Sequence, residues 1–115
     1  MVVDKVDEQT ADELFGALAD ATRRDIVRRA MGGDHSVSAL ARYYPMSFAA
    51  VQKHVAVLER AGLVTKQRRG RERLVQTDIN TLRAASRLLD ELEAVWRGRL
   101  DRSDAMLAGT HRRSQ

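Results

Sequence analysis

With 115 residues, the chain is long enough for one domain with a single core but not comfortably for two. Hydrophobic residues make up 43% of it and charged residues 31%, which excludes disorder over most of the length, and no apolar run approaches the roughly 20 residues that cross a bilayer. The absence of cysteine excludes disulfides, thiolate metal sites and thiol nucleophiles, while a net charge of +4 is compatible with a polyanionic partner.

The N-terminal segment is expected to precede the folded domain. Residues 1–9 have no apolar period and lack the basic-then-apolar pattern of a secretory signal, so we expect a flexible end on a cytoplasmic protein. Thr10, with Glu13 three residues later, has the pattern of a capping box for a helix over about 11–19. One face of this helix is apolar and consists of Leu14, Phe15 and Leu18.

A second helix is predicted over about residues 22–31. Either Asp20 or Thr22 can cap it, and the pair Gly32-Gly33 ends it. Its polar surface carries four arginines, which we expect to be solvated or paired with Asp20 and Asp25, with at most one reaching a phosphate: Arg23, Arg24, Arg28 and Arg29.

Two further helices follow with the spacing of a helix-turn-helix. Ser36 caps a short helix over about 37–43, which ends at Tyr43-Tyr44-Pro45 because the residue before a proline avoids helical angles. Ser47 caps a longer helix that runs to about Ala61, and a glycine follows as its stop. Two helices joined by a turn of about three or four residues form the helix-turn-helix unit.

The pattern then changes to short runs that favour β-structure. Residues 63–65 and 74–77 flank a basic segment centred on Gly70, which predicts a two-stranded hairpin. A long last helix is expected over about 79–107, followed by a flexible tail over 108–115. The expected fold is therefore mainly α with a small β-hairpin, a winged helix-turn-helix domain over residues 10–107 without an internal repeat or interdomain linker.

The formal excess of positive charge lies in one segment. Residues 66–73 read KQRRGRER and hold five basic residues against one acidic residue, which equals the net +4 of the whole chain. If the tip is regular, alternation places Arg69, Arg71 and Arg73 on one side of the ribbon and Arg68 on the other. This pattern indicates contact with a DNA backbone or minor groove. The alternative is a solvated hairpin whose charge only prevents edge-to-edge association.

The helix over residues 47–61 has one apolar and one polar face. Its apolar face consists of Val51, Val55 and Leu58, while small and cationic residues lie opposite, with Gln52 on the flank. Small residues let a helix backbone approach the major groove, and Gln and Lys can bond base edges. His54 lies at the boundary, where it can contact DNA or pack between helices. The candidate DNA-contacting residues are Ser47, Phe48, Ala49, Ala50, Gln52, Lys53, His54, Arg68, Arg69, Arg71 and Arg73.

The last helix has more apolar surface than one core needs. Two adjacent rows of large apolar residues follow it, so we expect one side to pack on its own domain and another side on a second copy of the chain. Burial within a monomer is the alternative. The candidate dimer-interface residues are Leu14, Phe15, Leu18, Leu88, Leu89, Leu92, Val95 and Trp96.

Several segments resemble the ArsR-type bacterial repressors. The family opening LADPTRRxIL is similar to ALADATRRDIV at residues 17–27, and its short helix VxELA to VSALA at 37–41. The recognition helix SQSTVSRHLKVLxxAGLV is similar to SFAAVQKHVAVLERAGLV at 47–64, and the wing motif RREGR to the QRRGRER that follows. The resemblance covers about residues 11–78. It implies a homodimeric transcriptional repressor that binds inverted-repeat operators and is released by an inducer, often a metal ion.

Departures from the family pattern favour its non-metal branch. Metal-sensing members carry CVC in the short helix, where this chain has Ser36-Val37-Ser38, and neutral hydroxyls are poor ligands for soft or borderline metals. Other members place Asp, His and Glu along the last helix, whereas here no histidine occurs between His54 and His111. We therefore expect no metal or other cofactor, and the inducer is unknown.

Together these features predict a sequence-specific DNA-binding regulator rather than an enzyme. Double-stranded DNA would be bound by the helix over 47–61 and the wing over 66–73 of a homodimeric repressor. A winged helix used only for protein interaction, and a ligand- or metal-responsive version of the same repressor, are the alternatives. No Ser/His/Asp set, paired carboxylates or phosphate-binding loop is apparent.

Overall fold

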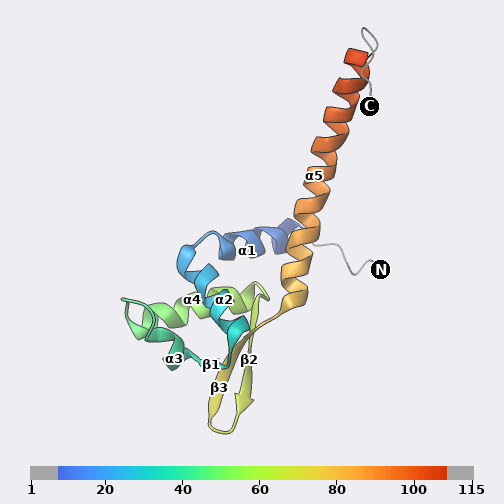
Figure 1. Ribbon diagram of the computed structural model, residues 1–115. Helices are drawn as coiled ribbons and strands as arrows, with labels where there is room; N and C mark the ends of the chain where they lie inside the picture. Colours follow the sequence, from blue (N-terminus) through green and yellow to red (C-terminus); the bar gives the residue numbers. More distant parts are fainter. Residues whose placement is uncertain (1–7, 109–115) are drawn as a thin grey trace. The chain divides into compact units, whose positions relative to one another are not determined.

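The computed structural model describes residues 8–108, which divide after Ala85 into two units. The first unit contains helices α1 to α4, strands β1 to β3 and the beginning of helix α5 (Figure 1). The second unit is the remainder of α5, which spans Ile79–Ala108. A helix-turn-helix followed directly by a β-hairpin confirms the predicted winged helix-turn-helix fold.

Helix α1 spans Glu8–Leu18 and begins earlier than predicted. Thr10 therefore lies inside the helix and the predicted cap at Thr10 is wrong, because Glu8 and Gln9, expected in the flexible N-terminus, are already helical. The carboxylate of Glu8 favours this start by stabilising the positive end of the helix dipole. At the other end of the chain, Ala108 is helical rather than part of the tail, and the expectations for residues 1–7 and 109–115 lie outside the described residues.

Helix α2 spans Ala21–Gly32 and is capped by Asp20, one of the two predicted candidates. The Oδ1 atom of Asp20 accepts a hydrogen bond from the backbone N–H of Arg23 at 3.0 Å. This backbone donor stabilises the ionised carboxylate and holds the pKa of Asp20 below its usual value. The helix ends where Gly33 adopts a fully extended backbone, so the glycine pair ends α2 as predicted.

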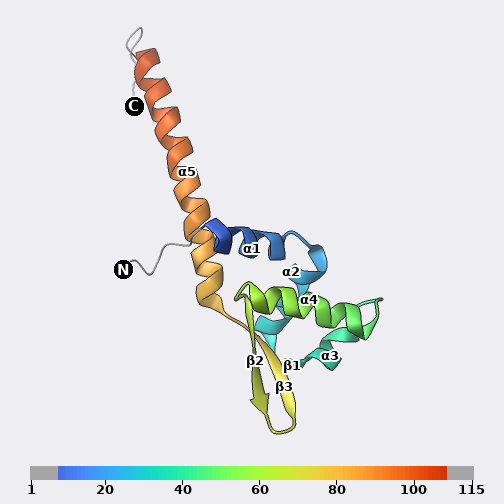
Figure 2. The same cartoon turned by 180° about the vertical axis from the view of Figure 1, so that it is seen from behind.

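Helices α3 (Val37–Ala41) and α4 (Phe48–Arg60) form the helix-turn-helix pair. The hydroxyls of Ser36 and Ser47 cap them as predicted, each accepting a hydrogen bond from a backbone N–H at 3.1 Å. Helix α4 ends just before Gly62, whose φ of 80° lies in the left-handed region that favours glycine. Packing of α4 against α1, α2, α3 and β2 fixes its orientation in the first unit (Figure 2).

The turn between α3 and α4 starts two residues earlier than predicted. The backbone N–H groups of Arg42, Tyr43 and Tyr44 each donate to the carbonyl three residues before, at 3.3, 3.0 and 3.3 Å. Such bonds tighten the last turn of a helix. They separate the end of α3 from Pro45, whose ring disfavours helical angles in the residue before it.

An antiparallel three-stranded sheet follows the order β1-β3-β2. Strand β1 (His35–Ser36) was not predicted, because two residues carry no periodic pattern; it pairs with the middle of β3. Strands β2 (Val64–Arg69) and β3 (Glu72–Thr77) are longer than predicted, since the basic side chains belong to the strands themselves. Both views show the β2–β3 tip projecting beyond the helices (Figure 1, Figure 2).

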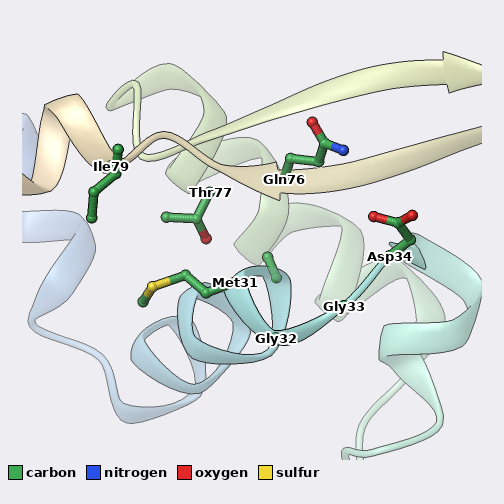
Figure 3. A pocket seen from close by; sticks show the side chains of 8 residues that line it. Met31, Gly32, Gly33, Asp34, Gln76, Thr77 and Ile79 are labelled. Carbon is green, nitrogen blue, oxygen red and sulfur yellow. The ribbon is translucent and has the colours of Figure 1, made fainter.

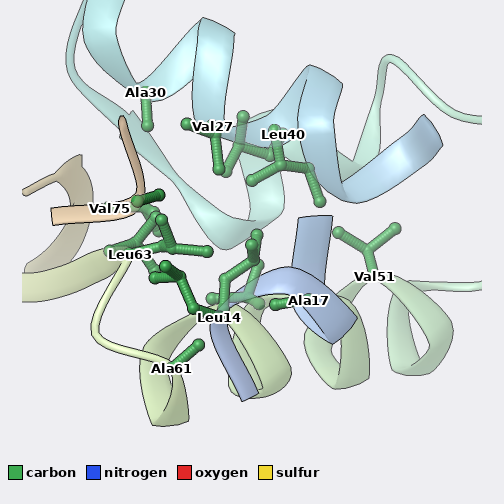
Figure 4. Packing of buried hydrophobic residues seen from close by; sticks show 14 residues of the cluster. Leu14, Ala17, Val27, Ala30, Leu40, Val51, Ala61, Leu63 and Val75 are labelled. Atoms are coloured by element: carbon green, nitrogen blue, oxygen red, sulfur yellow. The ribbon is translucent and has the colours of Figure 1, made fainter. Parts of the chain in front are cut away.

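The core of the first unit is aliphatic and draws on every helix and on both long strands. Leu14, Leu40 and Leu58 are fully buried, as are Leu63, just before β2, and Val75 in β3 (Figure 4). Ala85 extends this cluster into the beginning of α5. Burial of each such leucine contributes roughly 1.5–3 kcal/mol relative to an exposed one, so the core holds α4 and the hairpin as one rigid block.

Candidate nucleic-acid interface

The exposed face of α4 carries small, polar and cationic side chains. Val51, Val55 and Leu58 are fully buried, as the periodicity predicted. Of the candidate contact residues in this region, the exposed ones are Ser47, Phe48, Ala49, Gln52 and Lys53, while Ala50 and His54 are half-buried. The most unusual of them is Phe48, because a large aromatic side chain remains 46% exposed on this face.

One ring nitrogen of His54 is engaged inside the protein. Its Nδ1 lies 3.2 Å from Nη1 of Arg23, whose Nε and Nη2 donate to the carbonyls of Ala17 and Gly16 at 2.8 and 3.1 Å. A guanidinium can only donate, so Nδ1 accepts and the ring hydrogen of neutral His54 is on Nε2. His54 thus contributes to packing between helices through the bond from Arg23 to its Nδ1. Only its Nε2 is available for a contact with DNA.

The arginines of α2 divide into two pairs with different partners. Arg24, which is exposed, also binds a carbonyl at the end of α1, that of Leu18 at 2.7 Å, so of the two expectations, solvation or pairing with aspartates, the pairing is not found for Arg23 or Arg24. The guanidinium groups supply donors to carbonyls at the end of α1, where the helix has few of its own; that of Gly16 also accepts the backbone N–H of Ala19 at 3.2 Å. Arg28 and Arg29 pair with Asp25 at 3.2 and 2.7 Å, as expected.

A hydrogen-bonded cluster anchors the turn before α4. Asp25 accepts bonds from the hydroxyl of Tyr44 and from Nε of Arg29, both at 2.7 Å, and these donors hold the pKa of Asp25 below its usual value. Burial and the bond to Asp25 raise the pKa of Tyr44 to about 12. The guanidinium of Arg29 also stacks 3.7 Å from the centre of the Tyr43 ring. The start of α4 is thereby fixed to α2.

The register of the hairpin corrects the predicted faces of the wing. Arg68 pairs with Arg73 and Arg69 with Glu72, so Gly70 and Arg71 form a two-residue tip in which Gly70 has a φ of 64°. Cross-strand partners lie on the same face of a sheet. Arg68 and Arg73 therefore share one face and Arg69 lies on the other. The prediction was wrong because alternation along a strand does not continue through the turn.

The arginines of the wing differ in what they contact. Arg69 donates from Nη1 to Oδ2 of Asp34 at 3.2 Å. Within residues 8–108, no hydrogen bond or ion pair engages the side chains of Arg68, Arg71 or Arg73. Like charges directly opposite each other on a sheet are destabilising, so the Arg68–Arg73 pair is unfavourable unless an anion lies against it.

A groove of about 410 Å³ lies where α3, α4 and the wing meet. Four cationic side chains face it against the single carboxylate of Glu72, and we call it the basic groove; its lining consists of Ser36, Val37, Ser38, Arg42, Gln52, Lys66, Arg71, Glu72 and Arg73. It joins predicted residues of the recognition helix and the wing. Sequence reasoning missed Ser38 on α3 and Arg42, the C-cap residue of that helix; their spacing of four residues was the only available signal.

A second pocket, of about 520 Å³, shares none of these residues. It lies between the end of α2 and the end of β3, and we call it the α2–β3 pocket; it is lined by Ala30, Met31, Gly32, Gly33, Asp34, Gln76, Thr77 and Ile79. Asp34 and Gln76 mark one end and Met31 and Ile79 the other (Figure 3). Because Asp34 also binds Arg69, the rim of this pocket is connected to the wing.

The candidate dimer-interface residues have different environments. Leu14 is only 1% exposed and belongs to the core, so the structure corrects its assignment to an interface. Phe15 and Leu18 are half-buried against the core, and Leu88 is half-buried on α5. The exposed residues of α5 continue beyond the predicted set, and we call them the apolar stripe: Leu89, Leu92, Val95, Trp96 and Leu100.

The described residues form neither a metal site nor a membrane-spanning helix. Over residues 8–108, no group of three or more His, Cys, Asp or Glu side chains is arranged to hold a metal ion. Across the same range, every helix is too short or too polar to span a membrane. The hydroxyl of Ser36, at the position of the first thiolate in the metal-sensing pattern, is the cap of α3.

Comparison with known proteins gives consistent results. No protein-family model matches the chain. It is 40% identical over 88 residues to the HTH-type transcriptional regulator Rv2034 of Mycobacterium tuberculosis, an alignment that covers 76% of this chain and 79% of that protein. It is also similar to the structure of an ArsR-like transcriptional regulator from Rhodococcus sp. RHA1, with 30% identity, a TM-score of 0.74 and coverage of 92% and 96% of the two chains.

A more distant structure shares the fold. It is the homodimeric winged helix-turn-helix DNA-binding domain of Mb0332 from Mycobacterium bovis, a possible ArsR-family transcriptional regulator. Its identity to this chain is 20% and its TM-score 0.61, with coverage of 74% of this chain and 80% of that chain.

Proposed function

Because the chain belongs to the ArsR family of winged helix-turn-helix transcriptional regulators, we propose that it is a homodimeric repressor that binds an inverted-repeat operator. In this proposal, residues 47–61 enter the major groove and residues 66–73 contact the backbone or the minor groove beside it. The chain would act in the cytoplasm, where the DNA is, and would perform no catalysis.

The observation that carries the proposal is the set of wing arginines whose side chains have no partner among the described residues, two of which, Arg71 and Arg73, line the basic groove. Arg68 and Arg73 face each other across the hairpin, and neither has a counter-ion within the described residues. The repulsion between these two arginines destabilises the free protein, and bound phosphates would relieve it by supplying the opposite charge. A surface that served only solubility would gain nothing from this geometry.

The recognition helix supports sequence-specific contact. Ala49 and Ala56 are small and exposed, so the backbone of α4 can approach the floor of a major groove. Gln52 lines the basic groove and Lys53 is exposed beside it, which gives polar groups that can reach base edges. The remaining hydrogen of His54, on Nε2, can donate to a phosphate or base while Nδ1 stays bound to Arg23.

The apolar stripe on α5 supports dimerisation. Five large apolar side chains are exposed at helical spacing, including Val95 and Trp96, and water is an unfavourable environment for such a surface. A second copy of the same helix would cover it. Two winged helices on two half-sites also bind far more tightly than one, because the second contact becomes intramolecular. A distant structural neighbour is described as homodimeric.

We place the protein in the non-metal branch of the family. The hydroxyl of Ser36 is already engaged as a helix cap, and that of Ser38 lines the basic groove. The cations of the hairpin lie beside the recognition helix. This placement gives no support to the alternative in which the winged helix only binds another protein. The inducer, if the repressor has one, is not identified by these residues.

Fluorescence anisotropy with the DNA upstream of its own gene, beside a scrambled duplex, tests the proposal. We expect tighter binding to the upstream DNA, two chains per site, and a steep fall in affinity with salt. The matched variants are Arg73→Ala in the wing and Arg97→Ala on α5, which remove the same charge; Arg97 is paired with Glu93 at 2.8 Å. Equal losses for the two variants, or no binding at low salt, would overturn the proposed function.

A further inference from the structure

Phe48 and Gln52 lie one helical turn apart on the same side of α4. Both are exposed, and the side-chain amide of Gln52 makes no hydrogen bond within residues 8–108. Phe48 is the first residue of the helix and does not belong to the hydrophobic core cluster or to the residues packed against it. Its exposed ring and the free amide of Gln52 are therefore better explained by a ligand than by folding.

The two side chains match the two bases of one kind of base pair. The side-chain oxygen of a glutamine accepts a hydrogen bond from the N6 amino group of adenine, and its amide nitrogen donates one to N7, which gives a bidentate contact. An aromatic ring packs against the C5-methyl of thymine, which lies on the same major-groove edge of the pair. One helical turn of about 5.4 Å spans one to two base-pair steps, so both contacts can be made within a single step.

The rest of the face does not favour guanine at this place. Arginine is the commonest reader of guanine, and none occurs between Phe48 and Glu59. Ala49 is exposed next to Phe48 and leaves room for the methyl group and the backbone to approach each other. Lys53 is the next residue after Gln52 and so lies about 100° around the helix, which places it outside the Phe48–Gln52 pair.

We propose that Phe48 and Gln52 together read an A·T pair, or two adjacent ones, in each half-site, with Gln52 on adenine and Phe48 on the thymine methyl. This inference rests on the proposed function and adds the base identity that the recognition helix prefers. It makes Phe48 a residue that determines specificity through a methyl group, rather than one that only adds apolar surface.

The experiment begins with selection of tight-binding duplexes from a random pool by the purified full-length protein. In the selected duplex, single thymines are replaced by uracil, which removes only the methyl, and single adenines by 7-deaza-adenine, which removes only N7. We expect one thymine per half-site at which uracil weakens binding about fourfold, as loss of one buried methyl implies. We expect a loss of at least about fivefold at the neighbouring or paired adenine.

Variants assign these effects to the two side chains. Phe48→Ala should bind the thymine and uracil duplexes equally, whereas Phe48→Leu, which keeps an apolar contact, should retain the preference for thymine. Gln52→Ala should lose the sensitivity to 7-deaza-adenine. Ile79→Ala is the matched control, because Ile79 is a large apolar side chain with the same 46% exposure that lies outside α4 and the basic groove, and it should leave both ratios unchanged.

Three outcomes would count against the proposal. Sequence-specific binding without any thymine–uracil difference would overturn the methyl contact. A difference that persists unchanged in Phe48→Ala would assign the methyl to another residue and overturn the role of Phe48. Failure to enrich any duplex would overturn the proposed DNA binding itself, and binding of Phe48 to a protein partner would then become the explanation for its exposure.

Discussion

The guanidinium of Arg23 on α2 bonds Nδ1 of His54 on the recognition helix, with 3.2 Å between the two nitrogens. The same guanidinium donates to the carbonyls of Gly16 and Ala17 at the end of α1. One side chain thus connects three helices and orients the middle of α4. The face that α4 presents depends on this contact as well as on the apolar core.

Replacing Arg23 should therefore cost more stability than replacing its neighbour. Arg23→Ala leaves the carbonyl of Ala17 and a histidine nitrogen without this donor, while the carbonyl of Gly16 keeps the N–H of Ala19, and we expect a loss of about 1.5–3 kcal/mol in the free energy of unfolding. Arg24→Ala removes one bond, to the carbonyl of Leu18, and should cost about half as much or less. Urea unfolding followed by circular dichroism measures both, and equal losses would show that the His54 contact contributes nothing.

The unpaired arginines of the wing should determine the salt dependence of DNA binding. Arg68→Ala and Arg73→Ala should each reduce the slope of log affinity against log salt by about 0.9 if each side chain neutralises one phosphate. Their effects on different DNA sequences should be similar, because backbone contacts carry no direct sequence information. Anisotropy titrations at several salt concentrations give the slopes. Unchanged slopes in both variants would remove the wing from the interface.

Asp34 should restrain the wing by holding Arg69. Asp34→Asn removes the ion pair at 3.2 Å and frees a cation, so we expect tighter DNA binding by a few-fold and a salt slope steeper by up to about 0.9. Exposed pairs of this kind are worth only about 0–1 kcal/mol, so the fold should be retained. Asp12→Asn on α1 is the matched control, because Asp12 is exposed and outside the basic groove. If Asp34→Asn and Asp12→Asn increase DNA affinity by the same factor, the increase comes only from the change in net charge and not from the release of Arg69.

The hydrogen bond between Tyr44 and Asp25 should make stability depend on pH. Since the pKa of Asp25 is lowered in the folded state, its contribution is present above the usual value of 3.8 and is lost as pH falls through the lower folded value. Tyr44→Phe removes the largest cause of that lowering, so the variant should lose less stability on acidification. Urea midpoints measured from about pH 5 downward test this. Parallel curves for the two proteins would contradict it.

Tyr44→Phe should also change how the stability of the protein depends on pH in alkaline solution. The pKa of Tyr44 is raised to about 12 from its usual 10.0, so its contribution is complete below the usual value and is lost as pH rises toward the folded one. In Tyr44→Phe this loss should be absent.

The apolar stripe should control the oligomeric state. Leu92→Glu places a charge in the middle of exposed apolar residues, and we expect at least a tenfold weaker dimer, because a carboxylate cannot be buried there without a partner. Ala94→Glu is the control: Ala94 is also exposed on α5 but lies on the opposite side of the helix. Sedimentation equilibrium distinguishes them. A dimer that tolerates Leu92→Glu would place its interface elsewhere.

Most of the elements could be predicted from local signals. Ser36 and Ser47 cap their helices, and Gly62 and Gly70 adopt positive φ, because each of these preferences acts within a few residues of backbone. The periodicity of Val51, Val55 and Leu58 likewise determined the buried face of α4. The candidate recognition surface was therefore available from the sequence alone.

What the tertiary structure decided lies between segments far apart in the chain. Arg23 and His54 are 31 residues apart and Asp34 and Arg69 are 35 apart, and no local pattern links either pair. The register that sets Arg68 opposite Arg73 depends on the length of the turn, and strand β1 exists only because β3 offers it a partner. Local preferences act through the backbone of neighbouring residues, whereas the division of the wing arginines into bound and free depends on contacts that form only when the core brings distant segments together.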